Sequence, residues 1–140
     1  MKKTLFYILS FTWGLPLTLV GSIVALVLTM LGYKPKRHGY CFYFEVGENW
    51  GGLELGIIFL TNKNPSNYIK NHEHGHAIQN CLYGFFMPFI VSIPSAIRYW
   101  HREIRVRKGL NNGSSYDSVW FEGQATNWGN KFFEYLENGK

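Results

Sequence analysis

The chain has 140 residues, a formal net charge of +5 at pH 7 and 46% hydrophobic residues. This length excludes more than one domain of ordinary size. The positive charge would suit nucleic acid, but no recognised nucleic-acid-binding motif accompanies it, so no nucleic-acid partner is expected. Cys41 and Cys81 have neither CxxC nor zinc-finger spacing, and they could pair or stay free.

The first long segment, Leu5 to Leu31, is apolar and carries no charged residue. It exceeds the roughly 20 residues that span a bilayer, so it predicts one tilted or kinked transmembrane helix. A cleaved signal peptide is the alternative. However, the apolar run is too long for one, and no clear small-residue cleavage site follows. We therefore expect residues 1–33 to form a membrane anchor, with a lipid bilayer as partner.

Two runs rich in aromatic and β-branched residues come next, Gly39 to Gly47 and Leu53 to Thr61. The short segment between them, Glu48 to Gly52, ends in two glycines, which are typical of turns. The pattern predicts that the two runs form a β-hairpin. Because helical patterns follow it, the expected fold class is α+β.

A helix is predicted from Pro65 to Tyr83, with Asn64 as its N-cap and Gly84 as its stop. This helix contains the motif HExxH, formed by His72, Glu73 and His76 with two intervening residues. The two histidines lie one turn apart on the same face. His74 is rotated by roughly 200° to the opposite side, so we do not expect it to bind with them.

The HExxH pattern indicates a zinc hydrolase. His72 and His76 can bind one Zn²⁺ through their imidazoles, while Glu73 lies beside the metal-bound water as general base. The alternative interpretation is a pair of surface or core histidines on an amphipathic helix. A catalytic zinc usually has three protein ligands, so a third residue must come from elsewhere in the chain.

The third ligand is not given by the residues directly after His76, which exclude an HExxHxxGxxH motif. The downstream candidates are His101, Glu103, Asp117, Glu122, Glu134 and Glu137. Among these, Glu122 follows bulky aromatic residues and precedes small ones. Those small residues would let its helix approach another helix closely.

HExxH followed by Glu122-Gly123-Gln124-Ala125 resembles the gluzincin metallopeptidases, in which a Glu on a later helix completes the zinc site. More closely, HEHGHAIQ, FIVSIPS and WFEGQA resemble small membrane-associated proteins of the HEYGHxxQ type. The resemblance covers roughly Gly51 to Trp128 and implies His72, His76 and Glu122 as metal ligands. We expect the zincin-like domain to span residues 34–140. Thr126 stands where that pattern often has an Asp that orients a ligand histidine. His101 is the leading substitute for Glu122.

A second apolar stretch runs from Cys81 to Tyr99 and contains Pro88 and Pro94. If it crossed a membrane, Glu122 would lie on the side opposite the HExxH helix, and no three-ligand site could form. We therefore expect a helix that packs on the HExxH helix or dips into the membrane interface. Basic residues follow closely and favour anionic headgroups and a cytoplasmic domain; they are Arg98, His101, Arg102, Arg105, Arg107 and Lys108.

These patterns together predict a single-pass, membrane-anchored zinc metallopeptidase that hydrolyses peptides or proteins with Glu73 as general base. An oxyanion donor is expected among Tyr83, Tyr99, His101, Tyr116 and Tyr135. Two other classes remain open. One is a non-catalytic membrane protein with a structural or vestigial zinc site, and the other is a membrane-active protein of the holin or toxin kind.

Overall fold

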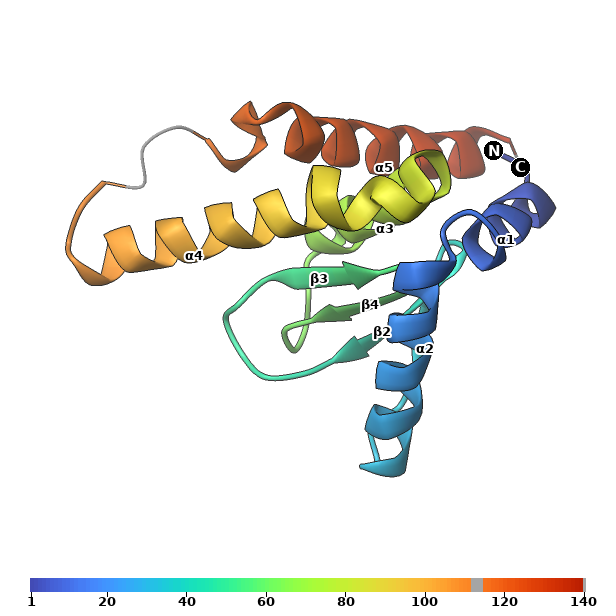
Figure 1. Cartoon of the computed structure of the whole chain (residues 1–140), viewed down its shortest axis with the longest axis horizontal. Helices are drawn as coiled ribbons and strands as arrows, with labels where there is room; N and C mark the ends of the chain where they lie inside the picture. Colours follow the sequence, from blue (N-terminus) through green and yellow to red (C-terminus); the bar gives the residue numbers. More distant parts are fainter. Residues whose placement is uncertain (112–114, 140) are drawn as a thin grey trace.

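The computed structural model describes residues 1–111 and 115–139 and shows an α+β fold. This part of the chain contains five α-helices and a small four-stranded sheet, with α3, α4 and α5 above the sheet and α2 at its right side in Figure 1. The helices are α1 Lys3–Phe11, α2 Leu15–Met30, α3 Asn67–Tyr83, α4 Ile93–Arg107 and α5 Trp120–Asn138. The strands are β1 Lys36–His38, β2 Cys41–Glu45, β3 Gly52–Leu55 and β4 Ile58–Thr61. The α+β class expected from the sequence is confirmed.

The N-terminal apolar segment forms two helices, α1 and α2, that meet at an angle of 91°. No single helix in the described ranges is long and apolar enough to cross a membrane, so Leu5 to Leu31 is not the one continuous helix that was expected, and the membrane anchor stays a prediction. The bend is held by α3: Trp13 Nε1 donates to the carbonyl of Leu82, and Asn80 Nδ2 donates to the carbonyl of Gly14. These contacts are long-range, and local hydropathy does not reveal them.

Both N-terminal helices pack against the rest of the protein. Phe6 of α1 is fully buried in the main core, together with Cys41, Phe44 and Phe59 from the sheet. On α2, Gly21 lies so close to Leu55 that an added Cβ would clash with its backbone oxygen. Residues before and after position 33 therefore share one core, and the expected domain division at that position stays a prediction.

The strand order in the sheet is β1-β2-β4-β3, which differs from the expected hairpin. The run from Leu53 to Thr61 is two strands, because Gly56 adopts a positive φ of 75° and turns the chain between β3 and β4. As a result β4 lies beside β2 in parallel, with Phe42 opposite Ile58. The hairpin prediction is wrong because a tight turn lies inside the second run. The arrangement leaves β3 at the sheet edge next to α3.

Helix α3 begins at Asn67, two residues later than the predicted start at Pro65. Ser66 is the N-cap, and its hydroxyl accepts a hydrogen bond from the amide of Ile69. Asn64 instead has a positive φ of 52°, in the loop before the helix. The helix ends at Gly84, which also has a positive φ, as expected.

Helices α3 and α5 cross at very short distance. An added Cβ at Gly75 would lie 1.9 Å from the carbonyl oxygen of Ala125, and one at Gly129 would lie 1.9 Å from that of Asn71. The close approach expected from the small residues after Glu122 is therefore confirmed. It brings one face of α5 directly against the HExxH face of α3.

The apolar stretch from Cys81 to Tyr99 is a bent connection rather than one helix. The axis turns by 115° after residue 86, and a short π-helical segment, Pro88–Ser92, leads into α4. Its two prolines occupy early helical positions, where a missing amide donor is tolerated. Met87 and Val91 are buried in a second core cluster with Phe121. The stretch thus forms one wall beside α3.

Candidate metal centre

Three buried residues converge between α3 and α5. The Nε2 atoms of His72 and His76 are 3.1 Å apart, and Glu122 Oε2 lies 3.1 Å from the first and 3.2 Å from the second. Within the described residues, these three form a group of ligand-type side chains that could hold a metal ion. The helix spacing and the close α3–α5 crossing together produce this arrangement.

The donor geometry suits a small tetrahedral cation. Bonds of about 2.0–2.1 Å in a tetrahedron place ligand atoms roughly 3.3 Å apart, close to the separations between these three atoms. The two imidazole nitrogens also point their lone pairs at one place. Such an approach is repulsive unless a proton or a cation lies between them. His72, His76 and Glu122 therefore fit a bound metal.

A hydrogen-bonded chain orients His72. The Thr126 hydroxyl donates to Asp117 Oδ1 over 3.0 Å, so its oxygen is left to accept from His72 Nδ1 at 2.8 Å. This fixes the tautomer that leaves Nε2 unprotonated for a metal. Thr126, where the chain departs from the gluzincin pattern, thus connects the ligand histidine to the carboxylate of Asp117, which lies nine residues earlier in the turn Tyr116–Ser118.

A second hydrogen-bonded chain orients His76. Its Nδ1 lies 2.7 Å from Gln79 Oε1. The amide of Gln79 donates to the carbonyl of Phe121 at 2.8 Å and to Gln124 Oε1 at 2.9 Å, so Oε1 is the acceptor toward the imidazole. The Nε2 atom of His76 is again left free to bind. Both histidines are therefore oriented through Nδ1, the ring nitrogen that does not face Glu122.

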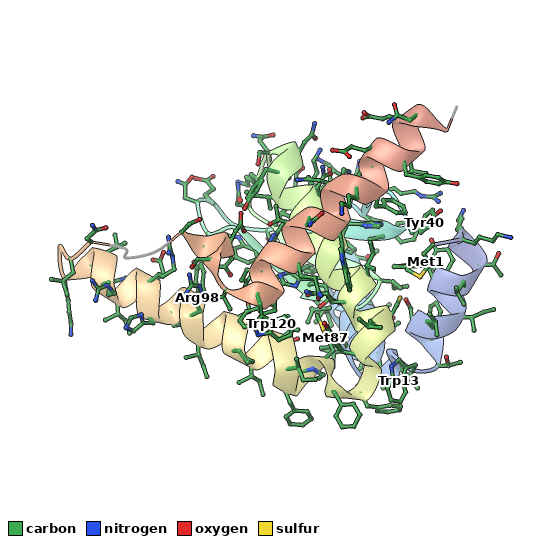
Figure 2. The ribbon with its side chains drawn as sticks, turned by 90° about the horizontal axis from the view of Figure 1, so that it is seen from above. Met1, Trp13, Tyr40, Met87, Arg98 and Trp120 are labelled. Atoms are coloured by element: carbon green, nitrogen blue, oxygen red, sulfur yellow. The ribbon has the colours of Figure 1, made fainter. Side chains whose placement is uncertain are left out.

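Glu122 is held from its other side. Its Oε1 accepts a hydrogen bond of 2.5 Å from the Ser95 hydroxyl, which lies 3.3 Å from the Tyr116 hydroxyl. Arg98, one turn along α4, donates to the carbonyls of Ser115 and Tyr116 and thereby ties α4 to the start of α5 (Figure 2). One carboxylate oxygen of Glu122 is thus fixed by α4, and the other faces the two histidines.

The electrostatics of the site favour a cation. Burial lowers the pKa of His76, but the hydrogen bond to Glu122 and the charges of Glu73 and Glu54 outweigh burial and raise that pKa to about 9. Burial raises the pKa of Glu122, but its hydrogen bonds with His72 and His76 outweigh this and hold the pKa well below its usual range. Burial raises the pKa of Glu73, and it raises that of Glu54 to about 8. A bound dication would replace the proton that this pocket attracts to His76.

Glu73 lies on the cleft side of the metal centre and is 5% exposed. It faces the edge strand β3 so closely that an added Cβ at Gly52 would meet its carboxylate. The acid is therefore held beside the two histidines without being one of the three converging ligands. A carboxylate beside a metal centre is able to accept a proton from a metal-bound water.

Two clefts of about 290 and 280 Å³ flank the centre. Both are lined by Gly52, His72, Glu73, Tyr99 and Tyr116, so together they form a groove that passes over the metal centre. One wall is the edge strand β3, and the other is formed by α4 and the segment that precedes it. Glu73 lines both clefts.

The other predicted candidates lie elsewhere. His74 is fully buried on the far side of α3, where its ring stacks on Phe132 with centroids 4.3 Å apart. Its Nε2 accepts from the amide of Tyr40, and burial lowers its pKa to about 3, so it stays neutral. His101 is exposed on α4 and does not join the cluster, which leaves Glu122 as the third residue.

Sequence reasoning missed four residues that support the site, namely Gln79, Ser95, Asp117 as a partner of Thr126, and Glu54. Gln79 had a local signal, because residues three apart on a helix are neighbours and Gln79 follows His76 by three. Glu54, buried in β3 at the groove, was hidden inside a run taken for a single strand. Ser95 and Asp117 come from distant segments, and no local pattern identifies them.

The chain through Thr126 leads to a first prediction. Asp117→Asn removes the carboxylate that polarises the Thr126 hydroxyl, so we expect metal affinity to fall about tenfold. Competition with a chromogenic chelator measures the dissociation constant. Glu134→Gln, on the exposed side of α5, is the control and should change nothing. Adding Thr126→Asp to the Asp117→Asn variant should restore affinity, and failure of both effects would exclude the relay.

Comparison with known proteins finds no matching family model, no similar curated protein and no similar solved structure.

Proposed function

We propose that the protein is a membrane-associated zinc metallopeptidase. The observation that carries the proposal is the convergence of His72 Nε2, His76 Nε2 and Glu122 Oε2 at tetrahedral spacing, with Glu73 beside them at an open groove. Two nitrogen donors and one oxygen donor suit Zn²⁺, and the groove leaves room for a fourth, non-protein ligand. The resemblance to gluzincins supports the same proposal.

When bound, Zn²⁺ would polarise the scissile carbonyl and lower the pKa of a water molecule. Glu73 then has the central role among the protein's own groups. Its carboxylate accepts a proton from the attacking water and later delivers it to the leaving amine. Because burial raises the pKa of Glu73, the acid holds the transferred proton more readily than an exposed glutamate would.

Tyr116 is the best placed of the five candidate oxyanion donors. It lines both clefts, and its ring lies 6.0 Å from that of His72. Burial raises the pKa of its hydroxyl, which therefore remains protonated and able to donate. Tyr135 and His101 are exposed away from the centre, whereas Tyr83 donates its hydroxyl to Gln124. Tyr99 also lines the groove and is the second choice.

Metal analysis combined with a cleavage assay tests the proposal. We expect one zinc per purified chain, hydrolysis of unfolded protein substrates or peptide libraries, loss of hydrolysis after chelation, and recovery on adding zinc. Mass spectrometry of the products identifies the cleaved bonds. A chain that binds no zinc would contradict the metal centre, whereas a zinc-loaded chain without hydrolysis would favour a structural zinc site.

A further inference from the structure

Helix α4 carries an apolar stripe that the described residues do not cover. The stripe consists of Ile93, Ile97, Trp100 and Ile104, and each is about half exposed or more. Spacings of four, three and four residues place them on one helix face. No residue of α4 is buried, so this face does not belong to the core. An apolar surface of this kind indicates an interaction partner.

The stripe continues into the segment before α4 and reaches the N-terminal helices. Phe85, Phe86 and Phe89 are all more than half exposed. Trp13 packs edge-on against the first two, with ring centroids 5.5 and 6.1 Å away, and lies at the edge of the molecule in Figure 2. We define the docking face as Phe85, Phe86, Phe89, Ile93, Ile97 and Ile104. Through Trp13 it joins the exposed apolar side of α2.

The basic residues beside the docking face indicate which kind of partner it binds. Arg107 and Lys108 are exposed, and helical geometry places both roughly 60° from the middle of the stripe. Between residues 98 and 108 the only acidic residue is Glu103. Apolar residues flanked by basic ones are typical of a helix that lies on an anionic bilayer. A second copy of this positively charged chain would instead bring like charges together.

We propose that the docking face inserts into the headgroup region of an anionic lipid bilayer, with α4 lying in the membrane plane. At 1.5 Å per residue a helix of this length extends about 22 Å, less than the roughly 30 Å of a hydrocarbon core. An in-plane helix keeps Arg107 and Lys108 at the phosphates while Ile93 and Ile97 enter the acyl boundary.

This orientation places the groove at the membrane surface. The side of the same segment that faces inward lines the larger cleft with Met87, Val91, Ser92 and Ser95. Trp100 both lines that cleft and is 59% exposed, so the groove and the lipid-facing stripe meet at this side chain. If the protein is the proposed peptidase, its substrate class is a peptide segment at a bilayer surface, such as the juxtamembrane part of a membrane protein.

Vesicle flotation of the full chain tests the docking face. We expect binding to vesicles of phosphatidylcholine with phosphatidylserine, and weaker binding at high salt or with phosphatidylcholine alone. The variant Ile93→Gln, Ile97→Gln, Ile104→Gln should partition at least about tenfold more weakly. Leu110→Gln with Tyr135→Gln changes exposed residues outside the docking face and should bind like the parent. Circular dichroism and zinc content confirm that all variants are folded.

Equal vesicle binding by the triple variant would overturn the proposal, as would a stripe-dependent dimer detected by light scattering. The substrate class is tested with one peptide presented free or attached to a lipid in the same vesicles. We expect at least about tenfold faster cleavage of the attached peptide, and loss of this difference in the triple variant. Equal rates would overturn the substrate class. Vesicle binding without any cleavage would refute the peptidase function and leave the docking face intact.

Discussion

Glu73→Gln is expected to retain zinc and to lose peptide hydrolysis by about 10²- to 10⁴-fold, the usual contribution of a general base. The amide keeps the size of the side chain, which matters because Gly52 lies directly against it. It cannot accept a proton from water at neutral pH. Rates with a saturating peptide, together with zinc per chain, measure both halves of the prediction.

The matched control for this variant is Glu103→Gln. Glu103 lines the second cleft but does not join the metal cluster, so its loss should change the hydrolysis rate by no more than a few-fold. Undiminished turnover in Glu73→Gln would leave the proposed mechanism without its base. Zinc loss in Glu73→Gln would instead mean that the side chain supports the metal directly.

Replacing either His72 or His76 by Ala is expected to abolish stoichiometric zinc binding, because two remaining protein ligands are too few for a stable site. His74→Ala should keep the zinc. It should instead lower the free energy of unfolding by about 2–4 kcal/mol, since it removes a fully buried ring that stacks on Phe132. Elemental analysis and urea unfolding separate the two effects.

The unfolding measurement also shows whether a variant loses its metal only because it no longer folds. Removing His76 leaves Glu122 buried with one fewer partner, so that variant must be shown to fold before its zinc content is interpreted. The Glu122→Gln variant is a useful addition, because it removes the charge and keeps the side chain's shape. Zinc loss confined to a folded His74→Ala variant would overturn the ligand assignment.

Local sequence patterns were sufficient where the structure depends on local geometry. The four-residue spacing of His72 and His76 places both on one face in any helix, and the small residues after Glu122 do permit the close α3–α5 crossing. The stop at Gly84 is equally local, because a residue with positive φ ends the helix. These features required no knowledge of distant contacts.

The wrong predictions concern features that distant contacts decide. The N-terminal segment is apolar enough for one long helix, yet Trp13 and Gly14 are bonded to the end of α3 and the chain bends there. The expected hairpin failed because the turn at Gly56 redirects the second run. The hydrogen bond from the Thr126 hydroxyl to Asp117 joins α5 to the turn before it, and the motif pattern around Glu122 does not reveal it. The expected cytoplasmic location stays a prediction.

The two glycines at the α3–α5 crossing have a consequence for redesign. Residue 75 is one of the two positions that HExxH leaves unspecified. Even a single methyl group there would strike the Ala125 carbonyl and push α5 outward, carrying Glu122 with it. In a randomised library selected for metal retention, position 75 should therefore return almost only glycine, and position 129 should behave alike. The spacing between the two backbones thus decides how closely Glu122 can approach the two histidines.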